Sequence, residues 1–543
     1  MSDYDKNEAK GSGPGAFNAS THEVHDEEVG IVKSDALKKD LKGRHMQMIA
    51  IGGAIGAGLF IGSGGALSKG GPAALIIGYM IVGIMLLFTM QALAELSVLY
   101  PVNGAFYTYV VRFLDPSWGF AMGWDYAIAW LTVLPFELIA ASITIKFWNE
   151  SISMGVWVTV FLVALTVIQV FGIKGYGEVE FVLSMVKICA CVGFIILGIV
   201  INCGGVGDQG YIGAKYWSDP GAFHNGFNGF CAVFVVAAFA FGGTELVGLA
   251  AAESENPRKA IPRAAKQVFF RIFLFYVVNL FVLGLILPSN DDRLLNSHGA
   301  NSKASPFVLA IQDAGIKVLP SIFNAVITVS VISVANSCTF GSTRTIQAMA
   351  TRKMAPGFFS YVDKAGRPLY CVALQLCFGF LAYIGLAAEG MTIFNWLLSL
   401  TGLSFFFVWG SICATHIRFE YAWKSQGFSL KQIPYRPPFG VWGSAAGLFL
   451  NILCLLATFY NALYPSPTAT PNVADFMQSY MALPLVLLLT LFWKIKSGDW
   501  SLYVKVQDMD LLSGARLLSP EDMEEVEQSR KGAWYSRAFH ALF

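Results

Sequence analysis

Long apolar stretches of helix length recur along this chain from about residue 45 to about residue 495, separated by short polar segments. Of the 543 residues, 55% are hydrophobic and only 13% are charged, whereas about 25% of the residues in an ordinary soluble domain are charged. A helix needs about 20 apolar residues to cross the hydrocarbon core of a bilayer. The pattern therefore predicts an all-α polytopic membrane protein with about twelve transmembrane helices.

The expected spans cover residues 45–66, 73–99, 118–146, 154–172, 178–202, 228–251, 267–288, 318–343, 369–388, 392–418, 439–463 and 476–495. They divide the chain into a cytosolic N-terminal tail (1–44), a first transmembrane repeat of helices 1–5 (45–202), an extracellular loop (203–227), a second repeat of helices 6–10 (228–418), two additional C-terminal helices (419–495) and a cytosolic C-terminal tail (496–543).

Positive charges indicate the orientation of these spans. Lys and Arg cluster before the first span and after the sixth, eighth and tenth, and the loops between contain fewer of them. The positive-inside rule places these clusters in the cytosol, and an even number of spans returns the C-terminus there. The first 44 residues lack the apolar segment of a cleavable signal peptide, so the first span is expected to direct the chain to the membrane.

Two expected spans are interrupted by small, flexible residues, the first at residues 52–58 and the sixth at residues 239–245. Such an interruption in lipid is tolerated where the freed backbone groups face protein, water or a ligand. Transporters with inverted repeats place discontinuous helices at corresponding positions of their two halves. We therefore expect a 5+5 inverted repeat with discontinuous helices 1 and 6, and a binding site where the two breaks meet. The alternative is that the glycines only permit close helix packing.

The breaks have the chemistry to bind a zwitterion. A restarting helix presents unpaired N–H groups and an ending helix presents unpaired carbonyls. The carboxylate of an α-amino acid is expected on the amides around Gly56, Ala57 and Gly58, and its ammonium on carbonyls near Phe239 and Gly242. The complete expected substrate site is Ile55, Gly56, Ala57, Gly58, Phe239, Ala240, Phe241, Gly242 and Thr244.

Three ionisable residues lie deep within expected spans: Glu137, Lys187 and Glu245. A charge at such depth is costly, so a functional or paired role is the default hypothesis. A buried lysine changes its protonation readily when its surroundings change, as proton coupling requires. The alternative is a permanent structural ion pair. Glu95 and His416 lie nearer the inner ends of their spans. A gating or capping role is favoured for Glu95, and a packing role for His416.

Several function classes have no support. The net charge is +1 and no basic cluster is interleaved with aromatic residues, which argues against a nucleic-acid partner. The nine cysteines show no paired or metal-like spacing, so neither a disulfide framework nor a metal site is expected. Without a nucleophile elbow, a Walker loop or a zinc-protease helix, the chain is not expected to be an enzyme or an ATP-driven pump. No cofactor is expected, and the buried lysine indicates protons as the coupling ion.

The segments around both breaks resemble the amino acid–polyamine–organocation superfamily, and more narrowly the fungal general amino-acid permeases. The similar segments are residues 44–59, 239–248, 253–262 and 394–404, and the similarity extends from about residue 40 to about residue 510. The resemblance implies that the substrate carboxylate binds at residues 56–58, that Phe239 covers the substrate, that Lys187 couples protons, and that Glu137 is the acidic residue of the third helix. Residues 336–344 and the pair Gly242-Gly243 depart from the family pattern, which leaves the substrate range open.

The implied function is proton-coupled, broad-specificity import of L-amino acids by alternating access at a fungal plasma membrane. Amino-acid substrate and membrane lipid are the implied partners. By analogy with the tails of similar permeases, Lys33, Lys38 and Lys39 are candidate acceptors for the ubiquitin ligase machinery. Two alternatives stay open: an amino-acid sensor (transceptor) with little or no transport, and a permease restricted to one amino-acid group.

Overall fold

The computed structural model describes residues 41–149, 151–206, 210–295, 305–386, 390–465, 470–519 and 523. Within these ranges the chain is helical, and its one β-type pairing is an isolated bridge between Leu41 and Ser254. Nine described helices are long and apolar enough to cross a membrane, or ten if the bent pair near the C-terminus forms one span. The all-α membrane class is therefore confirmed, whereas the count of twelve stays a prediction. The expected ubiquitin acceptors Lys33, Lys38 and Lys39 lie outside the described residues.

The first part of the chain forms α1 (Gly43–Gly52), the π-helix η1 (Gly58–Gly62), α2 (Ser63–Leu99), α3 (Ala105–Phe113), α4 (Pro116–Ile145), α5 (Met154–Val170), α6 (Gly172–Asn202) and η2 (Trp217–Gly221). The central part forms α7 (Gly226–Cys231), α8 (Val233–Phe241), α9 (Leu246–Ala250), η3 (Ala251–Glu253), α10 (Pro257–Phe270), η4 (Arg271–Val278), α11 (Asn279–Ile286), α12 (Asp292–Leu295), α13 (Pro306–Asp313) and α14 (Leu319–Thr351). The last part forms η6 (Gly357–Ser360), α15 (Leu369–Gly379), η7 (Phe380–Leu386), α16 (Gly390–Ser425), η8 (Leu430–Gln432), α17 (Gly440–Leu463), α18 (Val473–Tyr480), α19 (Ala482–Ser497) and η9 (Val506–Asp508).

Several helices are longer than their apolar segments. α10 begins at Pro257, where a proline suits the first helical turn, although the expected span begins at residue 267. α16 continues to Ser425, beyond the expected boundary at residue 418. α2 joins the end of the first expected span to the second, but Gly71 within it has φ of +82° and Pro72 follows, so the helix is kinked between the two spans. α18 and α19 are bent by 64° at Met481.

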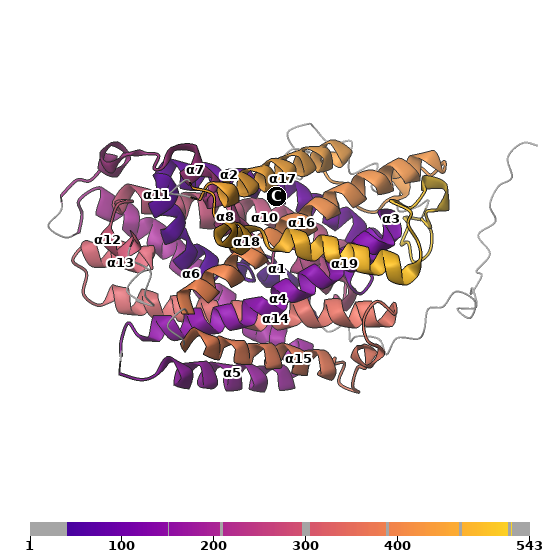
Figure 1. Cartoon of the computed structure of the whole chain (residues 1–543), viewed down its shortest axis with the longest axis horizontal. Helices are drawn as coiled ribbons and strands as arrows, with labels where there is room; N and C mark the ends of the chain where they lie inside the picture. Colours follow the sequence, from indigo (N-terminus) through magenta and orange to yellow (C-terminus); the bar gives the residue numbers. More distant parts are fainter. Residues whose placement is uncertain are drawn as a thin grey trace, which may run out of the picture. The chain divides into compact units, whose positions relative to one another are not determined.

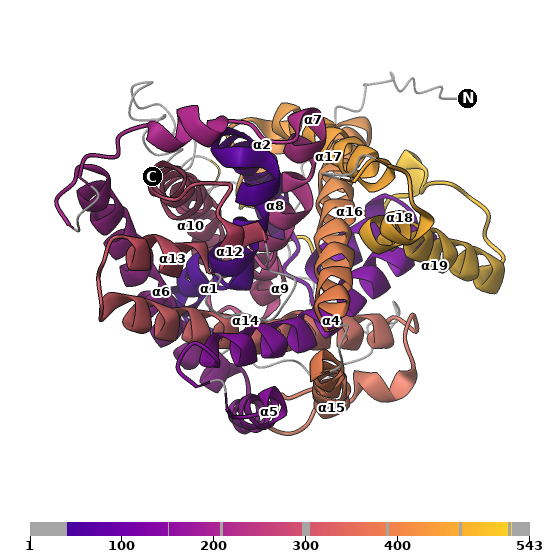
Figure 2. The same cartoon turned by 60° about the vertical axis from the view of Figure 1, so that its left-hand side comes forward.

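The interrupted sixth span is among the most enclosed parts of the molecule. In Gly226–Glu253, 89% of the most apolar window is buried, against 28% in α17. Figure 2 shows α8 and α9 surrounded by α2, α4, α14 and α16. A span so enclosed contacts protein rather than lipid, which is the condition under which irregular backbone is tolerated at membrane depth.

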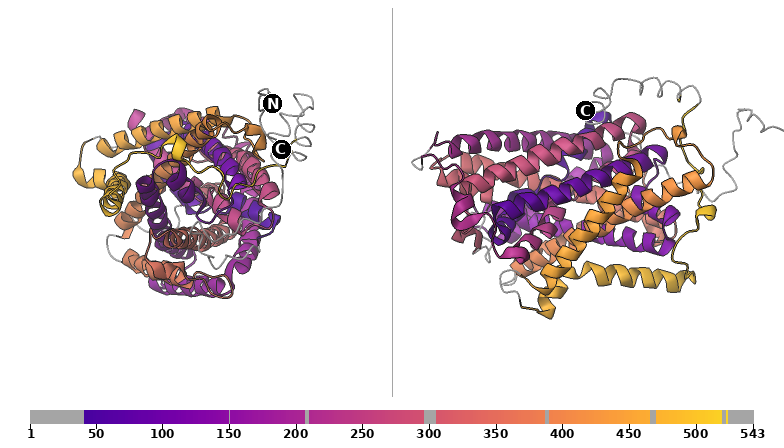
Figure 3. Two further views of the ribbon diagram at one scale, coloured as in Figure 1. Left: turned by 90° about the vertical axis from the view of Figure 1, so that its right-hand side faces the viewer. Right: turned by 90° about the horizontal axis from the view of Figure 1, so that it is seen from above.

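Helix packing brings the two breaks together. η1, at the restart of the first span, packs against α8 of the sixth, and α1 packs against α6, α9 and α10. α4 lies along α14, and α5 lies beside α15 (Figures 1 and 2). The long helices run in roughly the same direction (Figure 3). The two breaks are therefore walled by α4, α14 and α16.

Candidate functional site

The first break lies between α1 and η1. The Gly53 N–H donates to the Ile49 carbonyl at 3.1 Å and closes the last turn of α1. The next helical hydrogen bond runs from the Phe60 N–H to the Gly56 carbonyl at 3.1 Å. The N–H groups of the three residues between Gly56 and Phe60 precede that bond, so the helix offers them no backbone acceptor. The restarted helix therefore directs free donors and the positive end of its dipole toward the break.

The sixth break separates α8 from α9 and is shaped by two glycines. Gly242 has φ of −53° and ψ of 141°, and Gly243 has φ of +95°, a conformation that favours glycine. The carbonyls at the end of α8 already accept hydrogen bonds, for example that of Ala240 from the Tyr276 hydroxyl at 2.8 Å. A ligand ammonium at this end would thus add a second donor to carbonyls already in use.

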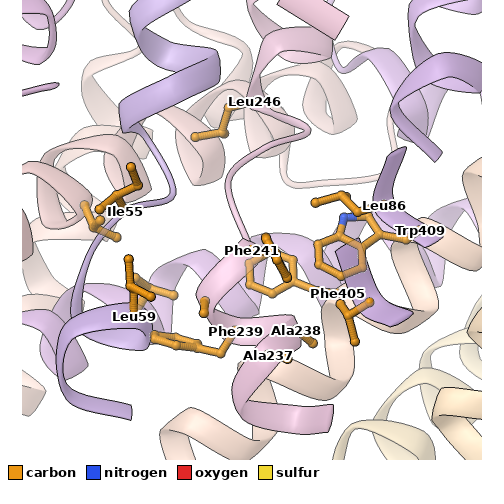
Figure 4. Close-up of a cluster of buried hydrophobic side chains, with 14 of the residues drawn as sticks. Ile55, Leu59, Leu86, Ala237, Ala238, Phe239, Phe241, Leu246, Phe405 and Trp409 are labelled. Atoms are coloured by element: carbon orange, nitrogen blue, oxygen red, sulfur yellow. The ribbon is translucent and has the colours of Figure 1, made fainter. Parts of the chain in front are cut away.

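A pocket lies between the two breaks. Its lining comes from both breaks and from α4, α14 and α16: Ala54, Gly56, Gly58, Trp130, Val133, Glu137, Phe239, Gly242, Val334 and Phe405. It contains about 250 Å³ of empty space, most of it too narrow to hold the centre of a water molecule. Figure 4 shows Phe239 of α8 beside Leu59 of η1. In this conformation the pocket is nearly closed, and a ligand of amino-acid size requires its lining to move apart.

Close approach of the two breaks explains the glycine at position 58. A methyl group there would lie 2.6 Å from the Ala240 Cα and 2.9 Å from the Phe239 ring, closer than side-chain carbons come to other atoms. A methyl group on Gly56 would collide with the side chain of Val334. The glycines therefore do permit close packing, and the pocket lies at the same place, so the packing and binding interpretations are compatible.

The predicted substrate residues divide into two groups. Those that line the pocket are Gly56, Gly58, Phe239 and Gly242. Those that are buried near the breaks without lining it are Ile55, Ala57, Ala240, Phe241 and Thr244.

The two phenylalanines of the sixth break have different environments. The Phe239 ring lines the pocket and meets Phe136 edge-on, with 4.7 Å between ring centroids. The Phe241 ring instead packs on Tyr276 and Tyr79, at centroid distances of 4.3 Å and 5.7 Å. Of the two, only Phe239 is placed to cover a bound molecule.

Glu137 of α4 lies in the pocket wall and is 1% exposed. Among the described residues, neither of its carboxylate oxygens has a partner with full hydrogen-bond geometry, but the backbone N–H of Ala57 faces the carboxylate closely enough to stabilise its charge. A methyl group on Gly56 would lie 3.7 Å from Glu137 Oε1, so the carboxylate adjoins the first break. Lys187 is close enough to act on it electrostatically. Because an uncompensated buried carboxylate is costly, a proton or a cationic partner would stabilise this position.

Lys187 of α6 is fully buried and belongs to a polar cluster. Its Nζ lies 3.8 Å from Oε1 of Glu180, which is also fully buried. The Ser184 hydroxyl donates to Glu180 Oε1 at 3.1 Å, and the Ser333 and Ser337 hydroxyls of α14 donate to Oε2 at 2.7 Å and 3.3 Å. The side chain of Glu180 is thus bonded to both α6 and α14, and Lys187 interacts electrostatically with both Glu180 and Glu137.

Glu245 is fully buried at the sixth break, and its carboxylate is hydrogen-bonded on both oxygens. Oε1 accepts from the Tyr126 hydroxyl at 3.0 Å and from the Gly243 N–H at 3.2 Å, and Oε2 accepts from the Trp409 indole at 3.2 Å. The buried Arg271 donates to the hydroxyl of the neighbouring Thr244 and acts electrostatically on Glu245. Glu245 therefore joins the break to α4, α16 and η4.

Sequence reasoning missed Glu180 and Arg271. Glu180 falls near the inner end of its expected span, where a charged residue does not by itself indicate a functional site. Its spacing to Ser184 and Lys187, four and seven residues on, is the one-face pattern of a helix and was the available signal. Arg271 lies near the start of the seventh expected span, at the beginning of η4, and is buried against Thr244 of the sixth break.

Sequence similarity to known proteins extends over most of the chain. The sequence profile of the family described as amino acid permease matches residues 45–505. Cationic amino acid transporter 1 of Schizosaccharomyces pombe is 50% identical over 499 residues, which cover 91% of this chain and 84% of that protein. General amino-acid permease GAP1 of Saccharomyces cerevisiae is 47% identical over 522 residues, with 94% and 86% covered. General amino-acid permease GAP2 of Candida albicans is 47% identical over 522 residues, with 95% and 89% covered.

Proposed function

Since this chain belongs to the amino acid permease family, we propose that it imports L-α-amino acids together with protons, by alternating access, across a plasma membrane. The observation that carries the proposal is the pocket between two broken spans, with free N–H groups on one side and helix-terminal carbonyls on the other. Broken helices of transporters use such groups to bind the charged ends of a substrate near the middle of the bilayer.

The proposed topology has twelve spans, in two inverted repeats of five with two C-terminal helices. The kink at Gly71 and Pro72 supports counting α2 as parts of two spans. Met154–Val170 is apolar but slightly shorter than a typical span, and α18 with α19 forms a bent one. The breaks fall in the first and sixth spans, which are equivalent positions of the two repeats. Both termini are cytosolic in this arrangement.

We assign the substrate carboxylate to the amides of Ala57 and Gly58, where the helix dipole is positive. The ammonium group then lies toward the end of α8, near Gly242. Phe239 covers the bound molecule, and the apolar side chains of Val133, Val334 and Phe405 surround the substrate side chain. Because only the backbone recognises the charged groups shared by all α-amino acids, this site suits broad specificity, as the names of GAP1 and GAP2 state for those proteins.

Glu137 favours a second candidate, a permease restricted to cationic amino acids. Its carboxylate lies in the pocket wall and has no partner with full hydrogen-bond geometry within the described ranges. A substrate ammonium or guanidinium group would compensate that charge. One relative is named as a cationic amino acid transporter.

We assign proton coupling to Lys187 with Glu137, rather than to Glu245. Lys187 interacts electrostatically with both Glu180 and Glu137, so a proton moved among these groups changes the charge beside the pocket. Glu245 is held by three donors, and its three bonds would have to be rebuilt at each turnover. Its proposed role is to position the sixth break.

We propose that the pocket is closed toward the cytosol in this conformation, and a buried ion pair supports this. Arg344 of α14 donates to both carboxylate oxygens of Glu253, at 2.9 Å and 3.3 Å, beyond the sixth break. The backbone of Leu41 also pairs with this segment, donating to the Glu253 carbonyl at 3.1 Å. Opening to the cytosol requires α14 and the end of the sixth span to separate, which breaks these bonds.

Transport by the purified protein in proteoliposomes tests the proposal. With an inward proton gradient, labelled amino acid should accumulate inside, and Lys187→Ala should abolish accumulation while leaving exchange without a gradient measurable. Cys189→Ala, on the same helix at an exposed position, is the matched control. Accumulation that follows sodium and ignores pH would reject the proton assignment, and binding without flux would indicate a sensor.

Competition by each unlabelled amino acid against one labelled substrate separates the two candidates for specificity. Inhibition by neutral and cationic amino acids alike supports the generalist. Inhibition confined to lysine, arginine and their analogues, abolished in Glu137→Gln, supports the cationic permease.

A further inference from the structure

A second group of buried ionisable side chains lies outside the pocket. It consists of Glu95, near the end of α2, and of His416 and Glu420, on α16. Glu95 and His416 are fully buried and Glu420 is 2% exposed. None of them takes part in the proposed transport site, and burial of charged groups at such a position calls for a compensating partner.

The three side chains converge on one point. His416 and Glu420 are four residues apart, which places them on the same face of α16. His416 Nε2 lies 3.2 Å from Glu95 Oε2. One ligand atom from each of the three residues lies within 4.8 Å of the other two. Two helices thus supply one imidazole nitrogen and two carboxylates to a shared space.

The atoms that face this space lack hydrogen bonds, while the atoms behind them are held. Across the described part of the chain, Glu95 Oε1 and Glu420 Oε2 have no hydrogen-bond partner, and His416 Nε2 and Glu95 Oε2 contact each other without hydrogen-bond geometry. His416 Nδ1 lies 2.8 Å from the Ser444 hydroxyl of α17. Glu420 Oε1 pairs with Lys424 at 2.7 Å and lies 3.6 Å from Arg436. The supporting contacts therefore orient the free atoms toward one another.

We propose that Glu95, His416 and Glu420 form a binding site for a divalent transition-metal ion of the Zn²⁺ class. Imidazole nitrogen and carboxylate oxygen bind Zn²⁺ at about 2.0–2.2 Å, and three protein ligands leave one position for water. Tetrahedral ligands at that distance lie about 3.4 Å apart, close to the separation of His416 and Glu95. The Ser444 contact on the other ring nitrogen is the supporting hydrogen bond that metal-binding histidines have.

One of the three residues, Glu420, adjoins an open cleft. The cleft is also lined by Lys424, Arg436, Phe439 and Trp442 and contains about 1120 Å³ of space, open solvent included. In the proposed orientation, these Lys and Arg residues lie on the cytosolic side, so the metal would enter from the cytosol. The bound ion would join α2 to α16 directly, and to α17 through Ser444.

This site was not expected from the sequence, which has no metal-like spacing of cysteine or histidine. His416 and Glu420 supply only one short-range pair, and the third ligand lies more than three hundred positions earlier in the chain. Only the packing of α2 against α16 brings the three together.

Direct titration of the purified full-length protein tests the proposal. After treatment with a chelator, the protein is titrated with Zn²⁺ alone in competition with a fluorescent zinc indicator. We expect one Zn²⁺ per chain, and at least about tenfold weaker binding in His416→Asn and in Glu420→Gln. His45→Asn, which alters another buried histidine beside a carboxylate, Glu178, should bind as the wild type does.

X-ray absorption of the zinc-loaded protein supplies a second readout, with four nitrogen or oxygen neighbours expected around the metal, including the signature of one imidazole ring. Should His416→Asn fail to fold, Glu420→Gln gives the same comparison with a neutral side chain of equal shape. Stoichiometric binding that is lost in the variants and kept in the control supports the site. Absence of binding by the wild type, or equal binding by Glu420→Gln, overturns it and leaves His416 and Glu95 as an ion pair without metal.

Discussion

The two breaks differ in how their polar groups are satisfied. At the sixth break, Glu245 accepts three hydrogen bonds and the Ala240 carbonyl accepts one from Tyr276. At the first break, the N–H groups of the restarted helix have no helical acceptor, and the adjoining carboxylate of Glu137 has only the Ala57 N–H beside it, without full hydrogen-bond geometry. A buried polar group left without a partner costs about 1–3 kcal/mol.

This difference assigns the breaks different tasks. The sixth break is held in place by side chains from α4, α16 and η4, so it serves as a fixed frame. The first break keeps more unused bonding capacity, since the Glu137 carboxylate there has only the Ala57 N–H and the charge of Lys187 near it, and it is there that a ligand gains most by binding. Catalytic and transport sites are pre-organised in this way, with a rigid support around groups that remain available.

The largest expected effect separates the two glutamates by stability. Glu245→Leu leaves the donors of Tyr126, Trp409 and Gly243 without their acceptor and removes the negative charge near Arg271, so we expect a loss of about 3–5 kcal/mol. Glu137→Gln should change stability by less than about 1 kcal/mol. Thermal unfolding of the two purified variants measures the difference. Equal losses in the free energy of unfolding would mean that the interactions of Glu137 stabilise the fold as much as those of Glu245 do.

Next in size is the effect of filling the contact between the breaks. In Gly58→Ala the new methyl group meets the Ala240 backbone and the Phe239 ring, so we expect uptake to fall about 100-fold, which corresponds to about 2.7 kcal/mol. Gly65→Ala, with nothing within 4 Å of the added methyl group, is the matched control. Uptake measured at equal protein amounts checks this, and normal uptake by Gly58→Ala would remove the breaks from the transport site.

A smaller effect distinguishes the two aromatic residues of the sixth break. Phe239→Ala should raise the substrate KM about tenfold, or about 1.4 kcal/mol, because the ring that covers the pocket is lost. Phe241→Ala should leave KM nearly unchanged and lower stability instead, since its ring packs on Tyr276 and Tyr79. Uptake measured against substrate concentration gives KM for both variants, and thermal unfolding gives their stability. A rise in KM confined to Phe241→Ala would reverse their roles.

The smallest expected effect tests a single bond of the fixed frame. Tyr276→Phe removes the hydrogen bond to the Ala240 carbonyl and keeps the ring contact with Phe241, so stability should fall by about 1 kcal/mol. KM should stay within about twofold of the wild type. Chemical denaturation and uptake assays measure both quantities. A large change in KM with no change in stability would show that this carbonyl belongs to the binding site.

Sequence patterns predicted the positions of both breaks well, because a glycine cluster inside an apolar stretch frees backbone groups that lipid cannot satisfy. They did not predict the direction in which the Phe241 side chain points. A break in a helix interrupts the helical periodicity from which the direction of a side chain is inferred. Polar helix extensions such as the start of α10 at Pro257 carry no apolar signal, and the short helix α3 lies in a segment expected to be a loop.

The partners of buried charges were the least predictable part of the site. Glu245 finds its donors on α4 and α16, at Tyr126 and Trp409, and Glu180 finds two of its donors on α14. Such contacts depend on the rotation of one helix against another, which a single sequence does not specify. Glu137 and Glu245 therefore look alike in the sequence, although Glu245 is hydrogen-bonded on both oxygens and Glu137 has only the Ala57 N–H and Lys187 near it.

The central claim is that the free amides of the first break bind the carboxylate of an amino acid. A cryo-electron microscopy structure of the wild-type protein with a bound substrate tests it most directly. We expect density for the carboxylate within hydrogen-bond distance of the Ala57 and Gly58 N–H groups, with Phe239 over the substrate. A substrate bound elsewhere, with those amides still without a ligand, would contradict the claim.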